Sequence, residues 1–117
     1  MRKLWKKHKL LVIAMPCILI VMIVGIMGYL KYQKNKEVKA CIAMGNRYLS
    51  ELDYEQAITS YRQALDLDEK NKEANLGLAE AYDSNDMIVY AESIYKTMLA
   101  EDDSQADVYE KLADIYM

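Results

Sequence analysis

This chain of 117 residues contains little histidine and cysteine, two residue types that often carry out acid–base, nucleophilic or metal chemistry. The one histidine, His8, lies among lysines near the N-terminus, and the two cysteines, Cys17 and Cys41, are far apart. The acidic run at 101–103 lacks the spacing of a calcium-binding loop, and no glycine-rich sequence is present to hold a phosphate. We therefore expect no enzyme activity, no metal site and no cofactor, and we interpret the acidic run as a solvated turn.

The elements that would position any site begin with an uncharged segment, Leu10–Leu30. It contains no Asp, Glu, Lys, Arg or His, and as a helix it would span about 30 Å, the thickness of the bilayer hydrocarbon core. Trp5 precedes it and Tyr29 and Tyr32 end it, which are residue types enriched at membrane interfaces. The sequence predicts a basic tail at 1–9, a single transmembrane helix at 10–30 that contacts lipid, and a charged helical linker at 31–37.

Two properties of this membrane segment follow from its flanks. Five Lys or Arg precede the span and four follow it closely, so the positive-inside tendency favours a cytoplasmic N-terminus and an extracytoplasmic domain at 38–117. A linker that continues the membrane helix would act as a stiff stalk, and a frayed linker would act as a short tether. The sequence leaves both forms of the linker open.

Charge divides the chain into two parts. Residues 1–39 carry nine Lys or Arg and one acid, whereas residues 40–117 carry six Lys or Arg and seventeen acids. An acidic domain repels nucleic acid, whose binding requires clustered positive charge. We expect no nucleic-acid partner.

Residues 38–117 contain an internal repeat with a period of 34 residues, which is typical of stacked helical hairpins. The first half of the unit recurs as Met44, Gly45 and Tyr48, then Leu78, Ala79 and Tyr82, then Leu112, Ala113 and Tyr116. The second half recurs as Ala57 and Tyr61, then Ala91 and Tyr95. The spacing predicts units at 38–71, 72–105 and 106–117, with second helices at 54–67 and 87–100. Asp53 is expected to cap the first of these second helices.

The repeat resembles the tetratricopeptide repeat (TPR). Cys41-x2-Met44-Gly45-x2-Tyr48 and Ala57-x3-Tyr61 follow the family pattern W-x2-L-G-x2-Y and A-x3-F, although the proline that closes each unit is replaced by Glu69 and Asp103. The resemblance implies an all-α chain: one transmembrane helix followed by about 2.5 repeats with five helices. The helix at 106–117 is expected to cap the array, or the array continues in a partner or in further residues.

The resemblance also implies which residues form the repeat core and which line a concave, partner-binding groove. The core residues are Met44, Gly45, Tyr48, Ala57, Tyr61, Leu78, Ala79, Tyr82, Ala91, Tyr95, Leu112, Ala113 and Tyr116. The groove residues are Lys39, Ile42, Asn46, Leu49, Glu73, Leu76, Glu80, Asp83, Asp107, Glu110 and Asp114. Such a groove is mostly acidic, which favours a basic or amphipathic peptide or helix over a free carboxylate. The alternative, that these acids form only a solvated surface, stays open.

These features predict a single-pass, membrane-anchored adaptor that binds or scaffolds a protein partner at the membrane surface. The alternative is a structural or accessory subunit of a larger membrane complex, in which the repeats act as a spacer. An accessory domain of an enzyme is a third possibility. The sequence identifies neither the partner nor the oligomeric state.

Overall fold

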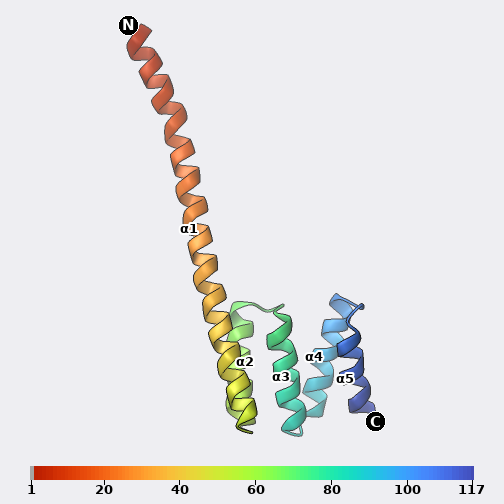
Figure 1. Cartoon of the computed structure of the whole chain (residues 1–117). Coiled ribbons are helices and arrows are strands. Elements are labelled where there is room, and N and C mark those ends of the chain that lie inside the picture. The colour runs from red at the N-terminus through yellow and green to blue at the C-terminus, as the bar shows by residue number, and fades with distance from the viewer. Residues whose placement is uncertain (1) are drawn as a thin grey trace. The chain divides into compact units, whose positions relative to one another are not determined.

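A computed structural model describes the backbone of residues 2–117 and the side chains of residues 5–117. The helices are α1 (Arg2–Ser50), α2 (Tyr54–Leu67), α3 (Lys72–Ser84), α4 (Ile88–Glu101) and α5 (Ala106–Tyr116) (Figure 1). Short turns connect them, and residues 2–117 contain no strand. The expected all-α class is confirmed. Of the predicted basic tail, Met1 and the side chains of residues 2–4 lie outside the described residues.

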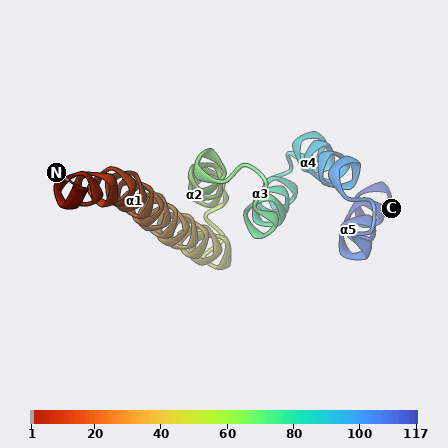
Figure 2. The same ribbon diagram turned by 90° about the horizontal axis from the view of Figure 1, so that it is seen from above.

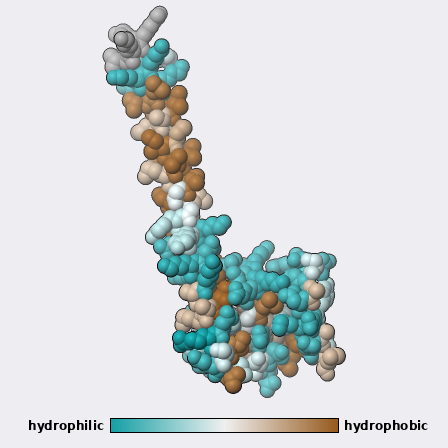
Figure 3. All heavy atoms as spheres, viewed as in Figure 1, coloured by the Kyte–Doolittle hydropathy of each residue, from teal (hydrophilic) through white to brown (hydrophobic). Residues whose placement is uncertain are grey.

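The chain divides into two units, residues 1–35 and 36–117. The first unit is formed by the N-terminal part of α1, whose apolar side chains lie on its surface (Figure 3). The most apolar 18 residues of this unit have a mean hydropathy of 3.0, and none of them is buried. The helix is therefore long and apolar enough to cross a membrane. Near one end Lys9 lies over the Trp5 ring at 5.2 Å, and near the other Gln33 Nε2 donates to the Tyr29 hydroxyl at 2.9 Å.

The second unit is a stack of helices in which neighbours along the chain pack together. The end of α1, α3 and α5 form one row, and α2 and α4 form the other (Figure 2). Contacts join α2 to α3, α3 to α4 and α4 to α5. The end of α1 joins the stack through α2, because the Tyr61 hydroxyl donates to Asn46 Oδ1. Hydrophilic side chains predominate on the surface of this unit, as expected for helices that bury one apolar face (Figure 3).

The turn inside each hairpin contains one residue with a left-handed backbone. Leu52 has φ 63° in the α1–α2 turn, and Asp86 has φ 61° in the α3–α4 turn. The next helix follows at once: Asp53 Oδ1 accepts from the Gln56 N–H at 3.4 Å, as expected of the predicted cap. Met87 forms no equivalent side-chain cap, and α4 begins at Ile88, one residue after the predicted start.

The core of the second unit is centred on the two tyrosines of the second helices. Tyr61 and Tyr95 are 0% and 2% exposed. The remaining predicted core residues that are buried are Gly45, Ala57, Leu78, Ala79, Tyr82 and Ala91. Tyr48 and Leu112 are half-buried against this core.

Four residues differ from their predicted positions. Ile42, expected in the groove, is buried in the core with Val38. Met44, Ala113 and Tyr116, expected in the core, are exposed. Met44 lies on the first repeat helix, so no preceding helix of residues 36–117 covers it. Ala113 and Tyr116 lie on α5, which packs against α4 and contacts α3 through the Lys72–Asp107 ion pair near its other end.

Candidate partner-binding site

Exposed carboxylates gather on the first helices of the second and third units. Glu73, Glu80 and Asp83 lie exposed on α3. Asp107, Glu110 and Asp114 lie exposed on α5. We call these six residues the acidic face; all six are among the predicted groove residues.

The α3 carboxylates lie close enough to the two buried tyrosines, Tyr61 and Tyr95, to affect their pKa values. Burial, followed by the negative charges of Glu80 and Glu73, raises the pKa of Tyr61 to about 12. Burial, followed by the charges of Asp83 and Glu80, raises the pKa of Tyr95 to about 12. Because the charge of Glu80 raises the pKa of both hydroxyl groups, Glu80 lies near both of them. The α3 carboxylates therefore create a negative potential near these hydroxyl groups.

Asp107 differs from the other acids of the face because it has a cationic partner. Lys72 Nζ lies 3.2 Å from Asp107 Oδ2, and this contact lowers the pKa of Asp107. Lys72 begins α3 and Asp107 lies in the first turn of α5, so the ion pair connects the first helices of two successive units. Glu110 and Asp114 form none of the ion pairs present among residues 5–117.

The predicted groove residues of the first unit, and Leu76 of the second unit, are less available for binding. Lys39 is exposed, but Asn46 accepts the hydrogen bond of Tyr61 and so supports the core. Leu49 and Leu76 are half-buried against the core, and Ile42 is 4% exposed. The apolar strip expected beside the acids is therefore narrower than the sequence indicated.

Two residues of this region were not predicted from the sequence. A Cβ at Gly77 would lie 2.4 Å from the ring of Tyr61, and the predicted core residue Gly45 has the same relation at 2.6 Å. Gly77 was missed because its equivalents in the other units, Ala43 and Lys111, do not share its size. Lys72 was missed because its partner lies on another helix, one unit further along the chain.

The described side chains offer no arrangement typical of catalysis or metal binding. Within residues 5–117, no group of three His, Cys, Asp or Glu side chains is placed to hold a metal ion. Cys41 is half-buried against the core, and Cys17 is exposed in the first unit. The arrangement can bind through charge and apolar contact.

Comparison with known proteins agrees with the geometry of the stack. A family model described as Tetratricopeptide repeat matches residues 48–115, from the end of α1 into α5. No curated protein matches the chain. The matched residues make up more than half of the chain, and the helices that they form alternate between the two rows described above. The chain belongs to the tetratricopeptide repeat family.

Proposed function

We propose that the protein is a single-pass, membrane-anchored adaptor that binds a basic or amphipathic protein segment through its acidic face. The fold is one of protein–protein interaction, and a stack of helical hairpins offers extended surfaces for binding. In this function the chain binds a protein partner and does not catalyse a reaction.

The observation that carries the proposal is the grouping of Glu73, Glu80 and Asp83 on one side of α3. Their charges act together on the Tyr61 and Tyr95 hydroxyls. No Lys or Arg forms an ion pair with them among residues 5–117. A basic partner segment supplies the missing positive charge, and it associates faster at low ionic strength because the attraction is screened by salt.

The test is site-specific crosslinking in the native membrane. A photo-crosslinking amino acid at position 80 is expected to capture a defined partner, and the same group at Asp66, exposed on α2 in the other row, is not. The charge-reversed variant Glu73→Lys with Asp83→Lys is expected to lose the crosslink formed from position 80.

A matched variant controls for net charge. Glu55→Lys with Asp66→Lys changes the net charge equally, but both residues are exposed on α2. This variant is expected to retain the crosslink. Equal capture by both variants would refute binding through the acidic face.

Membrane anchorage rests on the uncharged Leu10–Leu30 segment, in which every residue is exposed. We propose that this segment spans the bilayer, with the N-terminus in the cytoplasm and the repeats outside. An impermeant thiol reagent is expected to label a cysteine introduced at the exposed Ser84 in intact cells. Labelling only after lysis would place the repeats in the cytoplasm.

A structural subunit of a larger membrane complex is the alternative. Replacing residues 10–30 by an unrelated apolar helix separates the two functions. An adaptor retains its crosslink from position 80, because the segment serves as an anchor. A subunit held by its transmembrane helix loses its assembly.

A further inference from the structure

Positive charge gathers just before the uncharged segment of α1, and no acid of the chain neutralises it. Lys6, Lys7 and Lys9 are exposed and take part in no ion pair among residues 5–117. The first acidic residue of the sequence is Glu37, which follows the uncharged segment. An anion that neutralises these lysines is therefore expected to come from outside the chain.

Two of the three lysines share one face of the helix with a tryptophan. Lys9 Nζ lies over the Trp5 ring, 5.2 Å from its centre. Lys6 precedes Lys9 by three residues, so the two side chains are neighbours, about 60° apart around the helix axis. Lys7 lies about 160° away from Lys9 around the same axis. We call Trp5, Lys6 and Lys9 the basic face of α1.

The basic face has the donors that a phosphate group requires. Two ammonium groups on neighbouring side chains can approach one phosphate together, and each has three N–H donors. Lys9 can therefore donate to a phosphate oxygen while it stays over the Trp5 ring. The indole N–H of Trp5 is a further donor, and the Trp5 side chain is 68% exposed.

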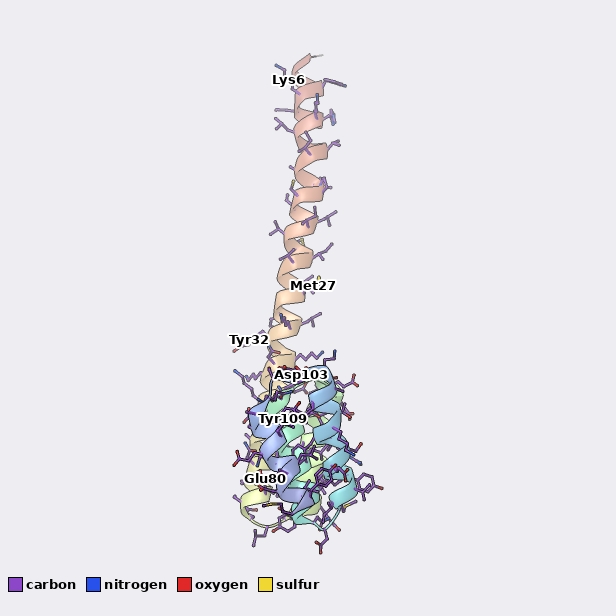
Figure 4. The ribbon with its side chains drawn as sticks, turned by 90° about the vertical axis from the view of Figure 1, so that its right-hand side faces the viewer. Lys6, Met27, Tyr32, Glu80, Asp103 and Tyr109 are labelled. Carbon is purple, nitrogen blue, oxygen red and sulfur yellow. The ribbon has the colours of Figure 1, made fainter. Side chains whose placement is uncertain are left out.

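The apolar side chains beside the basic face favour a phospholipid over a free phosphate ion. Ile13 follows Lys9 by four residues and continues the same face, and both Ile13 and Leu10 are exposed. Figure 4 shows Lys6 and Tyr32 near opposite ends of the apolar part of α1. Acyl chains can cover the apolar side chains while the phosphate lies at the lysines, whose own apolar stems extend along the helix. A phosphate ion would cover no apolar side chain.

We propose that the basic face of α1 is a binding site for the headgroup of an anionic phospholipid. This inference rests on the membrane anchorage of the proposed function, because the lipid reaches Lys6 and Lys9 only if Leu10–Leu30 lies in a bilayer. In the proposed orientation the site lies in the cytoplasmic leaflet, which is rich in anionic lipid. The site is separate from the acidic face, which binds the protein partner.

The test uses Trp5, the one tryptophan of the chain, as the reporter. The full chain is placed in nanodiscs of equal parts phosphatidylglycerol and phosphatidylcholine. Two preparations differ only in which lipid carries bromine atoms, near the headgroup end of its acyl chains, where they quench tryptophan fluorescence on contact. The ratio of the two quenching values gives the preference between the lipids, because the depth of Trp5 is the same in both. We expect a preference of about fivefold for phosphatidylglycerol, equivalent to one lysine at an anionic surface.

Single substitutions separate a site from diffuse positive charge. Lys6→Gln and Lys9→Gln are each expected to remove most of the preference for phosphatidylglycerol. Lys7→Gln is the matched control, because it removes the same charge from another side of α1, and it is expected to retain the preference. Lys9→Arg keeps both the charge and a cation over the Trp5 ring, so it is also expected to retain the preference.

Three outcomes would overturn the inference. The first is equal quenching by the two preparations of the wild type. The second is an equal loss of preference in Lys7→Gln and Lys9→Gln, because charge alone would then attract the lipid. The third is loss of the preference in inorganic phosphate but not in chloride of the same ionic strength, which would assign the basic face to a free phosphate ion.

The same experiment distinguishes failure of this inference from failure of the proposed function. Quenching by both lipids without preference would refute the headgroup site and leave the membrane anchorage standing. Quenching by neither lipid would show that Trp5 does not reach the bilayer. That result would contradict both the headgroup site and the anchorage on which it rests.

Discussion

The two buried tyrosines occupy the same position of the repeat but have different surroundings. Tyr61 lies between Gly45 on α1 and Gly77 on α3, where a Cβ would come within 2.6 and 2.4 Å of its ring. One period later, Tyr95 has Ala79 and Lys111 at the equivalent positions. Asn46 accepts the hydrogen bond of Tyr61, and its equivalent in the second unit is the carboxylate of Glu80.

One repeat pattern thus produces two different contacts between neighbouring helices. We call the contacts around Tyr61 the Tyr61 joint and those around Tyr95 the Tyr95 joint. The Tyr61 joint is fixed by close approach of two helices and by a hydrogen bond. The Tyr95 joint buries a ring of the same size, but larger side chains stand at the equivalent positions. We therefore expect the Tyr61 joint to be the less tolerant of substitution, and the predictions below test this difference.

Removal of the ring should have the largest effect. Tyr61→Ala is expected to lower the free energy of unfolding by about 3–5 kcal/mol, because it leaves a cavity and removes a hydrogen bond. Tyr95→Ala is expected to cost about 1 kcal/mol less, because among residues 5–117 the Tyr95 hydroxyl donates no hydrogen bond equivalent to that of Tyr61 with Asn46. Urea unfolding of the full chain in detergent, followed by near-ultraviolet circular dichroism of the tyrosines, measures both. Equal losses would show that the two joints are equivalent.

Addition of a methyl group at the Tyr61 joint is the next test. Gly77→Ala places a Cβ against a ring that is itself buried, and overpacking of this kind costs about 1–3 kcal/mol. The higher helix propensity of alanine offsets about 1 kcal/mol of that cost. Gly25→Ala is the matched control, since nothing lies within 4 Å of its added Cβ. A stabilised Gly77→Ala protein in the same urea experiment would contradict the close packing.

Alkaline pH distinguishes the joints by their charges. Both tyrosines have a pKa near 12 in the folded chain, raised from 10.0. Since the unfolded chain loses these protons first, the stability that each tyrosine contributes is fully present below pH 10 and is lost as the pH rises through 12. Between these two values the loss is about 1.4 kcal/mol per pH unit for each tyrosine. Ultraviolet titration should show two late-ionising tyrosines.

Single substitutions of the acids then assign the two late transitions. Glu73→Gln is expected to lower the pKa of Tyr61 alone, and Asp83→Asn that of Tyr95 alone. Glu80→Gln should lower both. If Glu80→Gln moved neither transition, the charge of Glu80 would not act on the two hydroxyl groups.

The smallest expected effect concerns the turns within the two hairpins. Leu52 adopts a left-handed backbone although it is 70% exposed, so Leu52→Gly removes strain without loss of packing. We expect a gain of about 0.5–1 kcal/mol. Asp86→Gly is expected to change stability by less, because Asp tolerates this conformation better than Leu. Differential scanning calorimetry of the full chain compares the two, and a larger gain at Asp86 would reverse the ranking.

The 34-residue period of the sequence was sufficient to predict the all-α fold of stacked hairpins. The predicted helix at 54–67 agrees with α2 at both ends, because Asp53 provides a local start signal that needs no tertiary context. The start of α4 was less certain because Met87 provides no such cap. Local chemistry therefore set how well each boundary could be predicted.

Periodicity was less informative about burial at the ends of the stack. Met44 and Leu78 occupy the same repeat position, but Met44 is 47% and Leu78 is 6% exposed. The difference depends on whether a preceding helix covers the position, which a repeat pattern does not state. The close packing at Gly77 could not be predicted for a related reason, since it depends on the ring of Tyr61 on another helix. The candidate site was anticipated through its charges, whereas the pairing of Asp107 with Lys72 required the structure.

The order of contacts along the stack has a consequence for how the protein is made. In the second unit, α2 meets α3, α3 meets α4 and α4 meets α5, so the contacts join segments that are close in sequence. Folds of low contact order form quickly, because short loops close at little entropic cost. Each hairpin can therefore pack on the one before it as it emerges from the ribosome or the translocation channel, and α5 joins last. Until the next helix arrives, the last hairpin exposes the apolar face that its neighbour will cover.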